Sequence, residues 1–339
     1  MTLPDRIADV QALEALMSTP SSALIDTLSR VPGDLMVLGV GGKMGPTLAR
    51  MAKRADTGRR VIGVARFSEP GLRQRLEAHG IECIAADLMS REALASLPDA
   101  PNIVFMAGRK FGSAGSEWLT WAMNAYVPAL VAERFPSARI VAFSTACVYP
   151  FVDVHGPGAA EDVAPTPLGE YANSCVARER LVQHFSHQQG TPGRLIRLSY
   201  AIDMRYGVLH DLARKLKAGE AINLTTGHAN IIWQGEANDW ILRSLAHCTT
   251  PTTPLNLSGP AVSIRTAAQG LADRLGVSAR FEGQEAPTAW LVDCHRAFEL
   301  FGPPRVGLDR MLDWTADWVQ RSQASLDKPT HFEARDGHY

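Results

Sequence analysis

The sequence predicts an α/β fold, with a doubly wound parallel sheet followed by a smaller mixed α/β lobe. Short apolar runs alternate with segments of helical periodicity between residues 34 and 200. Such alternation is typical of strands joined by right-handed helical crossovers and covered by helices on both faces. A glycine-rich turn follows the first apolar run, and the regular alternation loosens beyond about residue 200.

The first 200 residues divide into a cap and a sheet domain. Residues 1–33 are predicted to form an N-terminal helical cap, in which Ser21 or Ser22 begins a helix directed towards Arg30. Residues 34–200 are predicted to form the sheet domain. Its strands are expected at 35–38, 61–65, 81–86, 103–106, 140–143 and 195–198, and its helices near 71–79, 117–134 and 171–185.

The later part of the chain is predicted to form a smaller lobe at residues 201–325, from which the chain can re-enter the first domain. Helical periodicity recurs at 208–216, 237–246, 264–275 and 308–319, with short strand candidates at 222–224 and 255–257. A lobe beside the carboxyl ends of the strands is the usual place for a substrate pocket. Residues 326–339 are polar and are expected to lie on the surface as a tail.

Composition excludes several classes of protein. The net charge of the 339 residues is -1 without a basic block, so we expect no nucleic-acid partner. No run approaches the ~20 apolar residues of a membrane span, and the N-terminus does not resemble a secretory signal. The five cysteines are scattered and the histidines form no ligand pattern, which predicts reduced thiols, a cytoplasmic location and no metal site.

The turn after the first strand has the spacing Gly39-x-x-Gly42-x-x-Gly45 and is followed by Pro46 at the start of a helix. Glycines let the backbone approach a pyrophosphate, and the free N–H groups of a first helical turn point towards it. A flexible loop has the same composition, but the flanking strand and helix favour dinucleotide binding. The candidate contacts are Gly39, Gly42, Lys43, Met44 and Gly45.

Further motifs follow in order along the chain: Asp87-Leu88, Met106-Ala107-Gly108, the segment 144–150 (STACVYP) and the segment 171–175 (YANSC). Together with the glycine turn, they resemble the extended short-chain dehydrogenase/reductase family, also called the NAD-dependent epimerase/dehydratase family. The resemblance covers roughly residues 34–322 and implies a Rossmann domain. It also implies that Asp87, Leu88, Met106, Ala107 and Gly108 lie along the cofactor.

The resemblance implies an acid/base role for Tyr171 and an oxygen-orienting role for Thr145. In this family a lysine four residues after the tyrosine binds the nicotinamide ribose and lowers the pKa of the tyrosine. This chain has Cys175 at that position, which shares a helix face with Tyr171. Three interpretations remain: Tyr171 acts only as a proton donor, Lys110 or Arg109 supplies the cation, or the protein binds a cofactor without catalysis.

The second strand ends at Ala65 and is followed by Arg66, where an NAD site usually has an acidic residue. An arginine can bind a 2′-phosphate, and Lys43 in the glycine turn offers a second positive charge. These residues favour NADP over NAD. The alternative is that both are ordinary solvent-exposed charges.

The substrate is expected to be a small sugar-like, polyol or hydroxy-acid compound. The segment 228–236 has Ala229 or Asn230 where the family's nucleotide-sugar enzymes have a diphosphate-binding arginine. Tyr200 and Trp233 are candidate pocket walls. Two alternatives stay open, a nucleotide-sugar epimerase or dehydratase and a catalytically silent cofactor-binding protein. Related proteins pair through two helices that correspond to 118–131 and 171–184, so a homodimer is expected.

Overall fold

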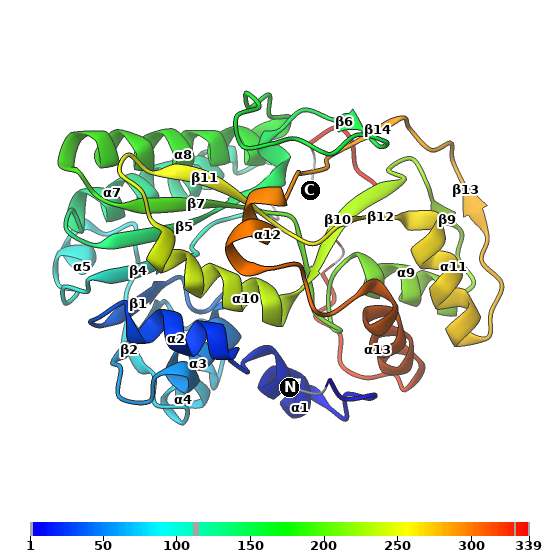
Figure 1. Cartoon of the computed structure of the whole chain (residues 1–339), viewed down its shortest axis with the longest axis horizontal. Helices are drawn as coiled ribbons and strands as arrows, with labels where there is room; N and C mark the ends of the chain where they lie inside the picture. The colour runs from blue at the N-terminus through cyan, green and yellow to red at the C-terminus, as the bar shows by residue number, and fades with distance from the viewer. Residues whose placement is uncertain (1–2, 111–114, 329, 338–339) are drawn as a thin grey trace.

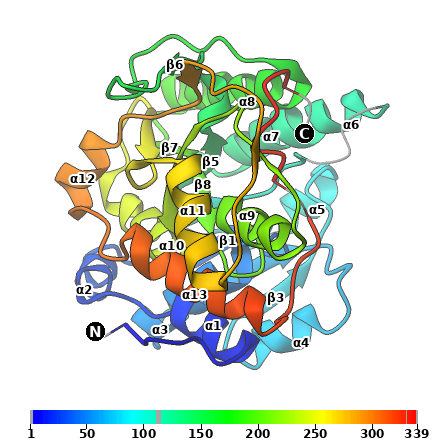
Figure 2. The same ribbon diagram turned by 90° about the vertical axis from the view of Figure 1, so that its right-hand side faces the viewer.

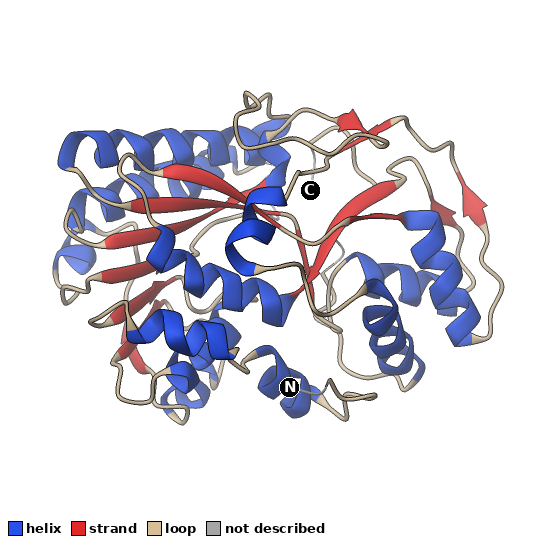
Figure 3. Cartoon of the chain, viewed as in Figure 1, coloured by secondary structure: helices blue, strands red, loops and turns tan. Residues whose placement is uncertain are grey.

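The computed structural model describes residues 3–110, 115–328 and 330–337, and its central element is a seven-stranded parallel sheet (Figures 1 and 3). The strand order is β11-β7-β5-β4-β1-β2-β3, which confirms the predicted doubly wound α/β fold. The strands are β1 (Leu35–Leu38), β2 (Val61–Ala65), β3 (Glu82–Ala85), β4 (Asn102–Phe105), β5 (Arg139–Thr145), β7 (Gly193–Leu198) and β11 (Thr253–Leu257).

Both faces of this sheet are buried, because successive side chains of a strand point in opposite directions. In β1, Leu35 and Val37 join the core beneath α2, α3 and α10, whereas Met36 and Leu38 join the core beneath α5, α7 and α8. These helices are α2 (Ser22–Ser29), α3 (Gly45–Ala55), α5 (Arg91–Ala95), α7 (Val127–Arg134), α8 (Gly169–Gln189) and α10 (Gln234–Arg243), with α4 (Leu72–Glu77) beside β3.

The helix expected near 117–134 forms, but it contains a π-helical turn, η1 (Ala122–Tyr126), between α6 (Glu117–Trp121) and α7. Such turns are rare in proteins, and those that occur are often found at functional sites. Asn124 lies within this turn, and its side chain bonds the backbone of Arg109, with 2.8 Å both from the Arg109 amide to Oδ1 and from Nδ2 to the Arg109 carbonyl.

The N-terminal cap contacts both parts of the molecule. Asp9 caps α1 (Val10–Met17) and Ser21 caps α2, in agreement with the expected cap at Ser21 or Ser22. Leu13 of α1 is buried in the core of the second lobe, whereas Leu24 of α2 is buried against the sheet. The cap therefore joins the two cores.

The second lobe is built around three mutually packed helices, α9 (Val208–Lys217), α11 (Ile264–Leu275) and α13 (Leu308–Gln320) (Figure 2). Its small sheets consist of β12 (Ala261–Ser263), β10 (His228–Trp233) and β8 (Tyr200–Ile202), then β13 (Phe281–Glu282) with β9 (Ile222–Asn223), and β14 (Thr288–Ala289) with β6 (Val152–Asp153). The remaining elements are α12 (His295–Phe301) and the short turns η2 (Ala146–Val148) and η3 (Ser244–His247).

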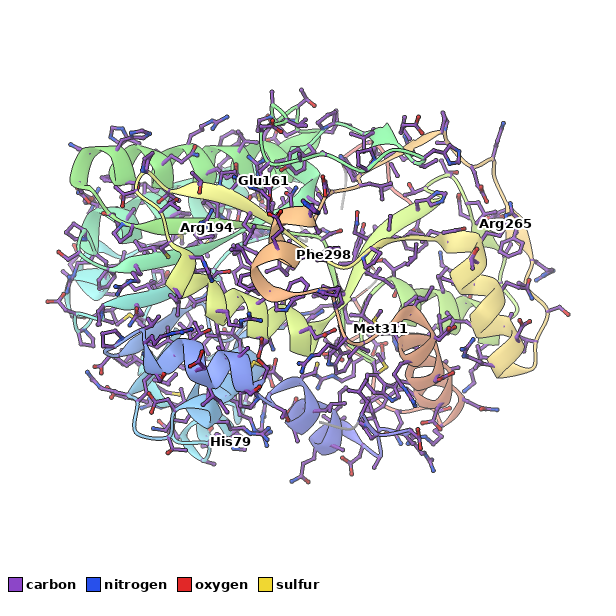
Figure 4. The ribbon with its side chains drawn as sticks, viewed as in Figure 1. His79, Glu161, Arg194, Arg265, Phe298 and Met311 are labelled. Carbon is purple, nitrogen blue, oxygen red and sulfur yellow. The ribbon has the colours of Figure 1, made fainter. Side chains whose placement is uncertain are left out.

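Two segments expected in the second lobe instead complete the first domain. Strand β11 pairs in parallel with β7, with Leu255 opposite Ile196, and α10 packs on α2 and α3. Glu161, labelled in Figure 4, accepts the backbone amide of Asn256 at the carboxyl end of β11, at 2.9 Å. The apolar side chains of both segments are buried against the sheet, a tertiary contact that local periodicity does not reveal.

The segment expected to lie on the surface as a polar tail packs against the second lobe. Thr330 and Phe332 are buried, and Thr330 donates from Oγ1 to the Asp211 carboxylate at 2.6 Å. Arg335 stacks on Phe151 at 4.0 Å from the ring centroid. Within the described ranges, no helix combines the length and apolarity that crossing a bilayer requires.

Candidate active site

The glycine turn lies at the carboxyl end of β1. Gly39 has a φ of +88°, and a Cβ at this position would lie 2.6 Å from the Ala107 backbone nitrogen. A Cβ on Gly45 would lie 2.2 Å from the Val40 carbonyl oxygen. Only glycine fits both positions without displacing backbone, so the turn stays close to β4 and directs the first amides of α3 towards the sheet edge.

A cavity of about 310 Å³ opens beside this turn, between the carboxyl edge of the sheet and the second lobe. It brings together part of the predicted site. The predicted residues that line it are Gly42, Lys43, Met44, Met106, Gly108, Thr145 and Tyr171. Those that do not line it are Gly39, Gly45, Arg66, Asp87, Leu88, Ala107 and Cys175.

Thr145 and Tyr171 meet at one side of the cavity. Thr145 ends β5, and its hydroxyl oxygen accepts the Cys147 amide at 3.2 Å. Its side chain also forms a hydrogen bond with the Tyr171 phenol. Burial raises the pKa of Tyr171 well above its usual value, assisted by the Cys175 and Cys147 thiols and opposed by Arg178 and Thr145. The phenol is therefore protonated at neutral pH and can donate a proton.

Cys175 is fully buried on α8, one turn after Tyr171. Burial raises the pKa of its thiol to about 11, so the side chain is neutral at pH 7. Cys175 belongs to a small apolar cluster with Ala146, Val148 and Tyr149. This agrees with a packing role, and all five cysteines are free thiols.

Arg178 is a cation at this site that sequence reasoning missed. Its guanidinium lines the cavity and is held by the Phe143 carbonyl (2.7 Å), the Asn124 carbonyl (3.1 Å) and the Asn124 side-chain oxygen (2.8 Å). Its charge lowers the pKa values of both Tyr171 and Cys175, against the effect of burial. The signal in the sequence was its spacing, because positions seven apart share one helix face.

The two basic residues proposed from the sequence also reach the cavity. The Lys110 ammonium lies 6.0 Å from the centroid of the Tyr171 ring, and burial lowers its pKa. Arg109 donates from Nη2 to the Ser116 hydroxyl at 2.8 Å. Of these two residues, Lys110 is the one whose charged group is placed close to the Tyr171 ring.

Lys43 and Arg66 face different surroundings. The Lys43 ammonium donates to the Ala201 carbonyl at 2.8 Å and lies 4.3 Å from the centroid of the Tyr206 ring, so this side chain is turned towards the second lobe. Arg66 follows β2, is exposed, and forms no hydrogen bond or ion pair with the described residues. The expected pair of charges around one phosphate is not formed in this conformation.

Asp87 and Leu88 follow β3. The Asp87 carboxylate accepts the Met89 amide at 3.0 Å, and Leu88 is buried. Both residues lie apart from the cavity lining.

A buried ionic network fixes the end of β5. Glu179 of α8 accepts the Ser144 hydroxyl at 2.6 Å and pairs with Arg197 of β7 at 2.7 Å. Arg197 also donates to the Tyr149 hydroxyl at 2.6 Å. Because every member is buried and bonded, the network holds α8 and β5 in one register and thereby positions Tyr171 relative to Thr145.

The expected pocket walls divide. Tyr200 lines the cavity, but Trp233 is buried away from it, with its ring centroid 5.1 Å from that of Trp314. Asn230 donates to the Gly259 and Val292 carbonyls and accepts the Val292 amide. Its amide is therefore used within the fold. Over the described part of the chain, no group of three potential metal ligands comes together.

The fold and the cavity define a dinucleotide-binding Rossmann protein with a second lobe beside the sheet edge. A model of the NAD dependent epimerase/dehydratase family matches residues 35–237. The chain belongs to this family of enzymes, of the extended short-chain dehydrogenase/reductase type, as the motifs predicted. A search of curated proteins finds no match.

Solved structures share the fold over most of the chain. UDP-glucuronic acid 4-epimerase from Bacillus cereus, in complex with UDP-glucuronic acid and NAD, is 17% identical with a TM-score of 0.70, covering 85% of this chain and 99% of that chain. UDP-glucose 4-epimerase from Thermus thermophilus, in complex with NAD, is 16% identical (TM-score 0.69; 84% and 98%). MoeE5 in complex with UDP-glucose and NAD is 21% identical (TM-score 0.67; 86% and 99%).

Proposed function

We propose that this chain is a nicotinamide-dependent oxidoreductase or epimerase acting on a hydroxyl or carbonyl group of a small sugar-like, polyol or hydroxy-acid substrate. The observation that carries this proposal is the Tyr171–Thr145 pair, which is hydrogen-bonded and faces a cavity beside the glycine turn. A bound nicotinamide would supply hydride transfer. Tyr171 would exchange the proton of the reacting oxygen, and Thr145 would orient that oxygen.

Tyr171 is best suited to donate a proton. A phenol with a raised pKa is protonated at neutral pH, so it is not available as a base but holds a proton that it can donate to an oxygen that gains negative charge. We therefore assign reduction of a carbonyl as the favoured direction. Arg178 is the cation that takes over the electrostatic part of the missing lysine's role, and Lys110 is the second candidate.

We propose NADP as the preferred cofactor. The close approach required at Gly39 and Gly45 fits a backbone cradle for a pyrophosphate. Arg66 is exposed at the end of β2, where it is available to a 2′-phosphate. Arg66→Ala should weaken NADPH binding about tenfold and leave NADH binding unchanged, as measured by fluorescence titration. Equal effects on both cofactors would contradict the preference.

The catalytic proposal is tested with Tyr171→Phe. Loss of the phenolic proton should lower kcat for reduction of small aldoses, ketoses and keto acids about 10²- to 10⁴-fold, with the NADPH dissociation constant unchanged. Thr145→Val should lower kcat less, because it removes one hydrogen bond to the reacting oxygen. Full activity in Tyr171→Phe would overturn the assignment.

A nucleotide-sugar epimerase or dehydratase is the second candidate, favoured by the structural neighbours named above, two of which hold a UDP-sugar. Against it, Ala229 or Asn230 stands where the arginine is expected, and the side-chain amide of Asn230 is already hydrogen-bonded to the Gly259 and Val292 carbonyls. Turnover of UDP-glucose or UDP-glucuronic acid at ordinary efficiency would establish this candidate and refute the small substrate.

A silent cofactor-binding protein is the third candidate, favoured by the neutral Cys175. An inactive wild type that binds NADPH, together with a Cys175→Lys variant that gains reductase activity, would establish it.

We also propose a homodimer. Trp118 is 72% exposed and Tyr126 45% exposed on the helix that packs against α8, and sedimentation should give twice the 36.8 kDa chain mass.

A further inference from the structure

Among the residues that the structure describes, the basic side chains around the cavity have no acidic counterpart in its lining. Lys43, Arg109, Lys110 and Arg178 all contribute to the wall, and among the described residues no aspartate or glutamate does. They come from three separate elements: the glycine turn, the segment after β4 and helix α8. A one-sided charge of this kind favours an anionic ligand over a neutral one.

Lys43 is the member of this group that is available for a ligand. Its ammonium donates one hydrogen bond, to the Ala201 carbonyl, and the Tyr206 ring covers one side of it. In the described structure it forms no ion pair. An ammonium has three donors, so binding capacity remains on the side that faces the cavity.

Asp203 is an acidic residue two positions after Ala201, but its carboxylate forms no direct contact that would neutralise the Lys43 ammonium. Its carboxylate accepts the Arg205 amide (2.9 Å), Nε (3.1 Å) and Nη2 (2.8 Å). Arg205 also pairs with Glu14 at 2.9 Å. Burial lowers the pKa of Lys43 to about 8, with Asp203 opposing and with Arg205 and Lys110 adding to the effect, so a ligand anion would restore a favourable partner for this ammonium.

We propose that the cavity binds a small substrate carrying a carboxylate group, and that the Lys43 ammonium holds this carboxylate while the reacting oxygen faces Tyr171. The inference rests on the proposed function and adds the charge of the substrate to it. Size agrees, because about 310 Å³ is at the lower end of the ~300–1,000 Å³ of ligand pockets.

A diphosphate of the cofactor is the other anion that could reach the glycine turn. The direction of the Lys43 side chain favours the substrate, since its ammonium contacts Ala201 and Tyr206 of the second lobe. Arg66 lies at the other end of the predicted cofactor path, beyond β2. If Lys43 holds the substrate carboxylate, removing its charge should weaken binding of the acid; if it holds the cofactor diphosphate, removing its charge should weaken binding of NADPH.

The test compares acids with neutral partners of matched shape: D-gluconate with D-glucitol, D-glucuronate with D-glucose, and D-lactate with propane-1,2-diol. Binding is measured by calorimetry, with and without NADPH. In the wild type, at least one acid should bind about tenfold or more tightly than its partner. Lys43→Met should abolish that preference and change the NADPH dissociation constant less than about threefold.

Two further variants complete the test. Lys43→Arg should keep most of the preference for the acid, because the positive charge remains. Lys328→Met changes the net charge equally at an exposed position outside the cavity lining and should behave as the wild type. The inference would be overturned if the wild type preferred none of the three acids to its neutral partner. It would also be overturned if Lys43→Met weakened NADPH binding about tenfold and kept the preference for the acid, which would assign Lys43 to the cofactor.

The proposed function is tested separately, by the wild-type titration with NADPH and NADH. Failure to bind either cofactor, with the preference for an acid intact, would refute the nicotinamide chemistry and support the carboxylate site. Binding of NADPH with no preference for any acid would do the reverse.

Discussion

The glycine turn and the first turns of α8 both face the cavity, yet they differ in how closely they follow the family pattern. The turn keeps all three glycines, whereas α8 keeps Tyr171 and replaces the lysine with Cys175. A Cβ on Gly39 would collide with the backbone of Ala107, and no change of side chain elsewhere could relieve this collision. A positive charge, in contrast, can reach one point from several elements, as Arg178 and Lys110 do here. Backbone geometry therefore constrains sequence more tightly than charge does.

The largest effect is expected at Gly39. Gly39→Ala combines a left-handed φ of +88° with a Cβ 2.6 Å from the Ala107 nitrogen, so it should cost about 3 kcal/mol or more in the free energy of unfolding. Gly219→Ala is the matched control, since Gly219 has a φ of +70° and no atom of the described residues would lie within 4 Å of its Cβ. The control should cost only about 1 kcal/mol. Equal losses in urea denaturation would show that the close approach to Ala107 carries no weight.

Arg178→Met should have the next largest effect, on both rate and stability. It removes the charge that lowers the pKa of Tyr171 and leaves the Phe143 carbonyl and both Asn124 oxygens without this donor. We expect kcat to fall about tenfold or more and the unfolding free energy to fall by about 1–3 kcal/mol.

A stability loss alone would also follow from a purely structural Arg178. The distinguishing readout is the pH–rate profile, whose upper limb should move to higher pH in Arg178→Met as the Tyr171 pKa rises. Arg178→Lys should restore part of kcat. An unchanged profile in both variants would leave Lys110 as the cation that acts on Tyr171.

The sequence predicted the fold because its signals are local. Apolar runs and the glycine spacing placed six of the seven strands, and the motif spacing placed Thr145 and Tyr171 on one cavity. The return of β11 to the sheet and the burial of Phe332 depend on contacts with distant segments, which periodicity does not encode. The direction of the Lys43 side chain depends on Ala201 and Tyr206, which are far from it in sequence.

The smallest effect near neutral pH concerns the titration of Lys43, the basic residue of the glycine turn. Its pKa of about 8 means that the ammonium is charged below pH 8 and neutral above it. Affinity for the acid of each pair should therefore be constant below pH 8 and should fall about tenfold per pH unit above it, whereas affinity for the neutral partner stays flat. Tyr206 does not interfere, since burial raises its pKa to about 12, and Asp203 is held by Arg205. Lys43→Met should remove the inflection near pH 8, so a decline that persists in that variant would assign the titration to Lys110, whose pKa is also lowered by burial.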